Sequence, residues 1–172
     1  MKTVFNSNSQ LANIFAAQNQ IFGRSKSMFF EHETAYSYGK HYIAATFITA
    51  DNGERICFVN SRSYSVTTAK HTQILWNAIP DGIKVFRVPM PRYFSYHQVS
   101  EVLKPMKEQA EKHLAKQLNA RKSTFHFYQA RNIIADIKEI SELFFLTCPN
   151  TWDFKNFEAA RQKVVTIQNQ VN

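Results

Sequence analysis

The fold is indicated most clearly by residues 42–59, which read YIAATFITADNGERICFV. Two runs rich in β-branched and aromatic residues flank Asp51-Asn52-Gly53, a strong signal for a tight turn. The pattern predicts a β-hairpin with strands over residues 42–49 and 55–59. Residues at equal distances from such a turn lie opposite one another, so we expect residues 40–42 near residues 62–64.

Further strands are expected on both sides of this hairpin. Residues 28–30 read MFF and resemble a short strand, and residues 36–39 are expected to turn into the hairpin. Residues 83–88 alternate apolar and basic side chains, which is typical of a strand with one buried face. The connections look too short for parallel crossovers, so the sheet is predicted to be antiparallel.

Helical periodicity is found before the strands and after them. A first helix is predicted over residues 9–22, with Gly23 as its stop, and another begins at a cap on Thr67 or Thr68. A long helix is expected from Ser95 onward, in which Pro105 either introduces a kink or marks the start. Two more helices are predicted near the end of the chain, the first capped by Ser123 and the second by Asn150 or Thr151.

Together these elements predict an α+β protein. The expected architecture is a small antiparallel sheet, made of the hairpin and one or two further strands, covered by an N-terminal helix and three C-terminal helices. With 172 residues the chain falls within the range of one domain. We therefore predict a single domain over 1–172, with a subdivision into a sheet-containing part, 1–93, and a helical part, 94–172, as the alternative.

The positive charge of the chain is concentrated in its middle third. The net charge is +8, and residues 61–122 contain eleven Lys or Arg against four Asp or Glu, whereas residues 1–60 contain five against four and residues 123–172 five against five. Clustered Lys and Arg attract phosphate groups, so this asymmetry predicts a polyanionic partner, either nucleic acid or a nucleoprotein complex. The alternative is a solvated helix face that happens to be basic.

Several other classes are disfavoured by composition. No run approaches the ~20 apolar residues of a membrane span, and residues 1–20 lack the apolar core of a signal peptide, so we expect a cytoplasmic protein without a membrane partner. Cys57 and Cys148 each have apolar neighbours and form no C-x-x-C pair, which predicts buried free thiols. The chain has neither a typical zinc motif nor a glycine-rich phosphate loop, so no metal or cofactor is expected.

The densest set of polar functional groups flanks the hairpin. Arg and Lys side chains supply charge, Ser and Thr hydroxyls donate hydrogen bonds, and the helix starting near Thr68 is expected to offer free backbone amides to a phosphate. Tyrosines in the same segments could stack on bases. The alternative is that the tyrosines pack on the sheet and the hydroxyls cap turns. The residues predicted to bind the partner are Tyr36, Tyr38, Lys40, His41, Arg62, Ser63, Tyr64, Thr68, Lys70 and His71, extended by Lys84, Arg87 and Arg92.

Two of these segments also resemble a known domain. The strings FFE at 29–31 and YSYGKH at 36–41, followed by NSRSYSVTTAKH at 60–71, are similar to an uncharacterised domain family encoded by tailed phages and other mobile elements. The similarity covers roughly residues 24–80. It implies a phage or mobile-element protein acting in a bacterial host, and it carries no activity with it.

Three functions follow as hypotheses. The first is a non-catalytic accessory protein that binds nucleic acid or a host nucleoprotein complex through the basic surface. The second is a host-defence inhibitor of the anti-CRISPR type, which docks on a host protein. The third is a metal-independent phosphodiesterase or nuclease in which His41 and His71 act as general acid and base. His32-Glu33-Thr34 resembles half of the paired motif of two-histidine phosphodiesterases, but the second half is missing.

Overall fold

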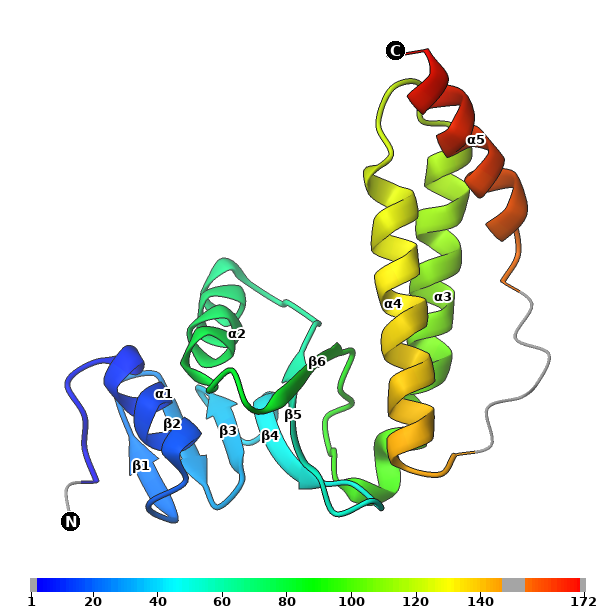
Figure 1. Cartoon of the computed structure of the whole chain (residues 1–172). Helices are drawn as coiled ribbons and strands as arrows, with labels where there is room; N and C mark the ends of the chain where they lie inside the picture. Colours follow the sequence, from blue (N-terminus) through cyan, green and yellow to red (C-terminus); the bar gives the residue numbers. More distant parts are fainter. Residues whose placement is uncertain (1–2, 147–153, 171–172) are drawn as a thin grey trace. The chain divides into compact units, whose positions relative to one another are not determined.

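The computed structural model describes residues 3–146 and 154–170, which form two compact units, Met1–Val99 and Ser100–Asn172 (Figure 1). The boundary lies near the alternative subdivision at residues 93 and 94. The first unit contains a sheet and two helices, and the second contains three helices. The α+β class predicted from the sequence is confirmed.

The sheet of the first unit has six strands whose order in space follows their order in the chain. Neighbouring strands pair antiparallel from β1 to β5, and β5 and β6 pair parallel. The prediction of a small, purely antiparallel sheet is therefore wrong, because the sheet is mixed and has more strands than expected. The strands are β1 (Phe22–Arg24), β2 (Met28–Glu31), β3 (Thr34–Ser37), β4 (Ile43–Thr49), β5 (Arg55–Asn60) and β6 (Lys84–Val88).

The central hairpin, β4 and β5, is confirmed with the expected register. Thr49 lies opposite Arg55, and Ala45 lies opposite Val59. The same alignment continues past the ends of the strands, where the Tyr42 hydroxyl donates a hydrogen bond of 2.5 Å to the carbonyl oxygen of Arg62. The turn therefore brings together the two polar segments that flank the hairpin.

The parallel pair arises because a helix connects its two strands. Helix α2 (Val66–Ala78) follows β5 and returns the chain to the start of β6. A crossover between parallel strands needs about a dozen residues or more, usually as a helix, and α2 alone has 13. The expectation that the connections are too short for this arrangement is thus wrong for residues 61–83.

The first helix is shorter than predicted. Helix α1 (Asn8–Ala17) ends at Gln18, which has the left-handed φ of 51°, and Gly23 lies in β1 instead of stopping a helix. A Cβ atom at Gly23 would lie 2.6 Å from the ring of Phe30 and 3.0 Å from that of Phe5. The glycine therefore allows two aromatic rings to pack against the backbone of β1.

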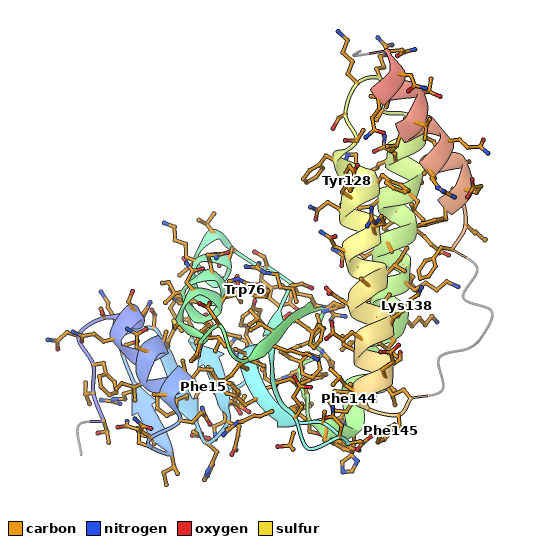
Figure 2. The ribbon with its side chains drawn as sticks, viewed as in Figure 1. Phe15, Trp76, Tyr128, Lys138, Phe144 and Phe145 are labelled. Carbon is orange, nitrogen blue, oxygen red and sulfur yellow. The ribbon has the colours of Figure 1, made fainter. Side chains whose placement is uncertain are left out.

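Aromatic side chains fill both faces of the sheet. Helices α1 and α2 lie on the same face (Figure 1), and Phe15 points from α1 into the layer between them and the sheet (Figure 2). Its ring centroid is 5.7 Å from that of Phe30 and 5.1 Å from that of Phe47. On the other face Phe58 contacts Phe86 and Phe94, at 5.9 and 5.4 Å. Burial of these rings supplies much of the hydrophobic stabilisation of this unit.

The second unit consists of α3 (Val99–Leu118), α4 (Phe125–Leu143) and α5 (Phe157–Asn169), and a short 3₁₀ turn, η1 (Tyr96–Gln98), precedes α3. Helix α3 continues through Pro105. Helix α4 has Thr124 at its N-cap position, so the cap predicted at Ser123 is wrong by one residue, although Ser123 Oγ accepts a hydrogen bond from the Phe125 amide. The caps predicted at Asn150 and Thr151, and Cys148, lie outside the described residues. The core of this unit is built from Ala110, Leu114, Phe127, Ala130, Ile134, Ala160 and Val164.

Candidate functional site

A pocket of about 520 Å³ opens in the first unit where the two segments flanking the hairpin meet. Its wall comes from the turn between β3 and β4, the end of β5, the start of α2 and the segment after β6. Five of the residues predicted from the sequence line it, namely Tyr38, His41, Tyr64, Thr68 and Arg92. The rest of the lining consists of Ser37, Tyr42, Ile43, Asn60, Met90 and Pro91.

Tyr42 joins the two halves of the pocket. It is buried, and its phenol donates to the Arg62 carbonyl oxygen, while its ring meets that of Tyr64 edge-on at 5.6 Å. Burial raises the pKa of Tyr42, so the phenol stays neutral and keeps its proton for this hydrogen bond. Tyr64 itself is 74% exposed, so one edge of its ring is supported and most of its surface faces solvent.

Tyr38 is held in an unfavourable backbone conformation. Its φ is 62°, a left-handed value that costs a tyrosine on the order of 1–2 kcal/mol. The ring is 62% exposed and rests against the imidazole of His71, with 5.6 Å between the centroids. The next residue, Gly39, leaves room for His41, since a Cβ atom there would lie 2.8 Å from His41 Nδ1. The turn thus contributes Tyr38 and His41 to the lining of the same pocket.

His71 supports this turn from inside. The residue is 2% exposed, and Asn8 Nδ2 lies 3.0 Å from Nε2 while Ser37 Oγ lies 2.7 Å from Nδ1. Because an amide NH₂ only donates, Nε2 accepts and the proton on Nδ1 is donated to Ser37. Ser27 Oγ also lies 3.2 Å from Nε2. Burial lowers the pKa of His71, which agrees with a neutral ring in this network.

This arrangement corrects the role assigned to His71. Both ring nitrogens are engaged inside the protein, and the residue is absent from the lining of the pocket. A general acid or base needs an accessible nitrogen within hydrogen-bond reach of its substrate. The structure therefore does not bring His41 and His71 together as an exposed catalytic pair, and His71 instead positions Tyr38 and Ser37.

The start of α2 also differs from the expectation. The helix begins at Val66, with Ser65 as its cap, and the Thr68 amide donates to Ser65 Oγ at 3.1 Å. In return Thr68 Oγ1 accepts hydrogen bonds from the amides of Ser65 and Tyr64, at 3.0 and 3.2 Å. This capping box satisfies the Thr68 amide, one of the first-turn donors predicted to bind a phosphate. Thr68 itself is one of the residues that line the pocket.

Several predicted residues have partners away from the pocket. The Lys40 ammonium forms an ion pair with Glu31 at 2.5 Å, and this contact raises the pKa of Lys40. Lys84 forms an ion pair with Glu54 at 3.3 Å. The Arg87 guanidinium lies over the Trp76 ring, 4.6 Å from its centroid. Tyr36 stacks on a neighbouring strand, with its ring 4.9 Å from that of Phe29. The remaining members of the predicted set, Arg62, Ser63 and Lys70, are exposed on the segment that enters α2 and on α2 itself.

Sequence reasoning missed two parts of this site. Met90 and Pro91 line the pocket, but the sequence marks them only as the end of a strand. Asn8 and Ser27 reach His71 across 63 and 44 positions of the chain, so no local pattern could have indicated them.

Other classes of site find little support in residues 3–146 and 154–170. Within these residues no three His, Cys, Asp or Glu side chains are grouped so as to hold a metal ion, and no helix is both long and apolar enough to cross a membrane. Cys57 is a buried free thiol, and burial raises its pKa, which makes it unreactive. The pocket remains the best-formed candidate.

Comparisons of the chain with protein-family models, with curated proteins and with solved structures found no match.

Proposed function

We infer that this chain is a non-catalytic accessory protein of a phage or other mobile element, and that it binds nucleic acid, free or in a host nucleoprotein complex, through the pocket and its rim. The observation that carries the proposal is that one pocket is lined by two exposed tyrosines, Tyr38 and Tyr64, and by Arg92, whose guanidinium lies 5.7 Å from the centroid of the Tyr93 ring. Aromatic faces bind bases, and guanidinium groups bind phosphates.

The charge distribution supports the same partner. Arg62 is exposed at the pocket rim, where its carbonyl accepts from Tyr42, and Lys70 is exposed on α2. With a net charge of +8, the chain attracts polyanions at long range, and these cations add short-range phosphate contacts. The resemblance over residues 24–80 supports a mobile-element origin.

Binding can be tested by fluorescence anisotropy with labelled oligonucleotides between about 50 and 300 mM salt. We expect affinity to fall steeply with salt, because bound cations release counterions from the phosphates. The double variant Arg62→Ala, Arg92→Ala should bind about tenfold more weakly at 150 mM salt, with a salt slope smaller by roughly 1–2. A total absence of salt-sensitive binding to DNA and RNA contradicts the proposal.

A matched control separates the pocket rim from charge in general. The double variant Lys104→Ala, Lys112→Ala removes two exposed cations from α3 and therefore changes the net charge by the same amount. We expect it to change affinity less than the rim variant does. Equal losses in the two variants would show that the basic α3 face contributes as much as the rim.

A further inference from the structure

The pocket has a shape that a phosphate-binding surface does not require. Its volume of about 520 Å³ falls within the range of roughly 300–1,000 Å³ found for pockets that enclose small ligands. Contacts to phosphate groups alone come from side-chain and backbone donors and need no pocket of this volume. A pocket of this size lined by two tyrosines therefore leaves room for a larger part of a nucleotide.

The two tyrosines are positioned for stacking. Tyr64 is supported at its ring by Tyr42, and Tyr38 by His71, each with 5.6 Å between centroids. This support lowers the entropy lost when a flat ligand packs against the remaining exposed surface of each ring. Glycine or asparagine would adopt the left-handed backbone of residue 38 at lower cost, so the strain at Tyr38 agrees with a role for its ring, although four other non-glycine residues in the described parts of the chain also have a positive φ.

The polar groups inside the pocket are largely committed to the protein. Ser37 is paired with His71, and the Asn60 side chain donates to the Ile43 carbonyl and accepts from the Arg62 amide. Ile43, Met90 and Pro91 add apolar surface. A base entering this pocket would meet aromatic and aliphatic groups more than free hydrogen-bond donors. Such a site accepts any base, since every base has a stacking face.

We propose that the Tyr38–Tyr64 pocket takes one unpaired nucleotide, with its base stacked on the tyrosines and its phosphate held by Arg92 and His41 at the wall. Bases of a duplex are stacked on both faces and paired at their edges, so they enter a pocket only after extrusion, which costs a few kcal/mol. The preferred ligand is therefore single-stranded nucleic acid with little base preference. This proposal rests on the nucleic-acid-binding function proposed above.

The test compares single-stranded and duplex 12-mers of one sequence, each made as DNA and as RNA, by anisotropy at a fixed salt concentration. We expect single strands to bind at least tenfold more tightly than duplexes, and homopolymers to differ from one another by only a few-fold. The fluorescence of a single strand carrying 2-aminopurine should change on binding, because the base leaves its neighbours in the strand and stacks on a tyrosine. The nucleic acid that binds more tightly, RNA or DNA, identifies the natural ligand. Preference for the single strand over the duplex supports the proposal with either nucleic acid.

Point variants locate the stacked base. Tyr38→Ala and Tyr64→Ala should each weaken single-strand binding by roughly five- to hundredfold, the range that loss of one aromatic stacking partner produces, and should leave duplex binding unchanged. Tyr38→Phe retains the ring and should restore most of the affinity. Tyr128→Ala is the matched control, since Tyr128 is an exposed tyrosine on α4 in the other unit (Figure 2). The fold of each variant is checked by circular dichroism.

The outcomes distinguish this inference from the proposal on which it rests. If salt-sensitive binding is present but duplexes bind as tightly as single strands, or if both tyrosine variants bind single strands normally, the pocket inference is wrong and nucleic-acid binding stands. If neither single strands nor duplexes bind in a salt-sensitive way, both are wrong. Loss of binding in Tyr38→Ala without recovery in Tyr38→Phe also contradicts stacking, because the ring alone should suffice.

Discussion

Replacing His71 with alanine is expected to lower the free energy of unfolding of the first unit substantially. The side chain is 2% exposed and contacts Ser37, Asn8 and Ser27, so its loss leaves polar groups without their partner. An unsatisfied buried hydroxyl costs about 1–3 kcal/mol, and the space left by the ring adds about 1–2 kcal/mol. The expected total is about 2–5 kcal/mol, a large part of the stability of a domain of this size.

Urea denaturation followed by tryptophan fluorescence measures this effect. The chain has two tryptophans, and Trp76 lies on α2 in the same unit as His71. A Trp152→Phe background makes Trp76 the sole reporter, so that unfolding of the second unit does not contribute to the signal. The control is His97→Ala, which removes an exposed histidine and should change the free energy of unfolding by less than about 0.5 kcal/mol.

The pH dependence gives a second readout. Because burial lowers the pKa of His71 in the folded state, the unfolded state binds more protons between that pKa and about 6.5. The contribution of His71 to stability is therefore complete above about pH 6.5 and is lost as the pH falls through the folded-state pKa. His71→Ala should lack this component, whereas His97→Ala should keep it. Equal free energies of unfolding for the two variants at pH 7.5 would refute the structural role of His71.

Two further predictions concern packing and capping. Gly23→Ala should lower the free energy of unfolding by about 1–3 kcal/mol, since the new methyl group would overlap the Phe30 ring. Gly82→Ala is the control, because a methyl group at residue 82 would meet no neighbouring atom and should leave the free energy of unfolding unchanged. Urea titration followed by Trp76 fluorescence compares the two variants. Gln117→Ala should destabilise the second unit by about 1–3 kcal/mol, because the buried Gln117 side chain accepts from the Phe127 amide and donates to the Ser123 carbonyl. Circular dichroism at 222 nm should show a lower melting temperature for Gln117→Ala than for Gln109→Ala, an exposed site on α3; equal values would contradict this role.

Local signals in the sequence were sufficient for the hairpin and for the long helices. The Asp51-Asn52-Gly53 turn sets the register of β4 and β5, and that register brings Tyr42 to Arg62. Strands β1 and β3 were not predicted, because each has three or four residues and a short segment carries too little periodicity. The sequence predicts too long a first helix because Gly23 resembles a helix stop, whereas in the structure Gly23 lies in β1 and makes room for Phe30.

The composition of the site was also partly predictable. Tyr38, His41, Tyr64, Thr68 and Arg92 were expected to bind and do line one pocket. The charge of a side chain did not indicate which Lys and Arg residues line the pocket. Lys40, Lys84 and Arg87 instead contact Glu31, Glu54 and Trp76, and these contacts depend on how distant strands and helices pack.

By itself, the sequence determined the α+β class, the central hairpin and the excess of positive charge, because turn residues, side-chain alternation and composition act over a few neighbouring positions. The tertiary structure decided which tyrosines are exposed, that β6 pairs parallel to β5, and that His71 is an internal support. These features depend on contacts between residues far apart in the chain, since burial and hydrogen-bond partners are settled only when the helices pack on the sheet.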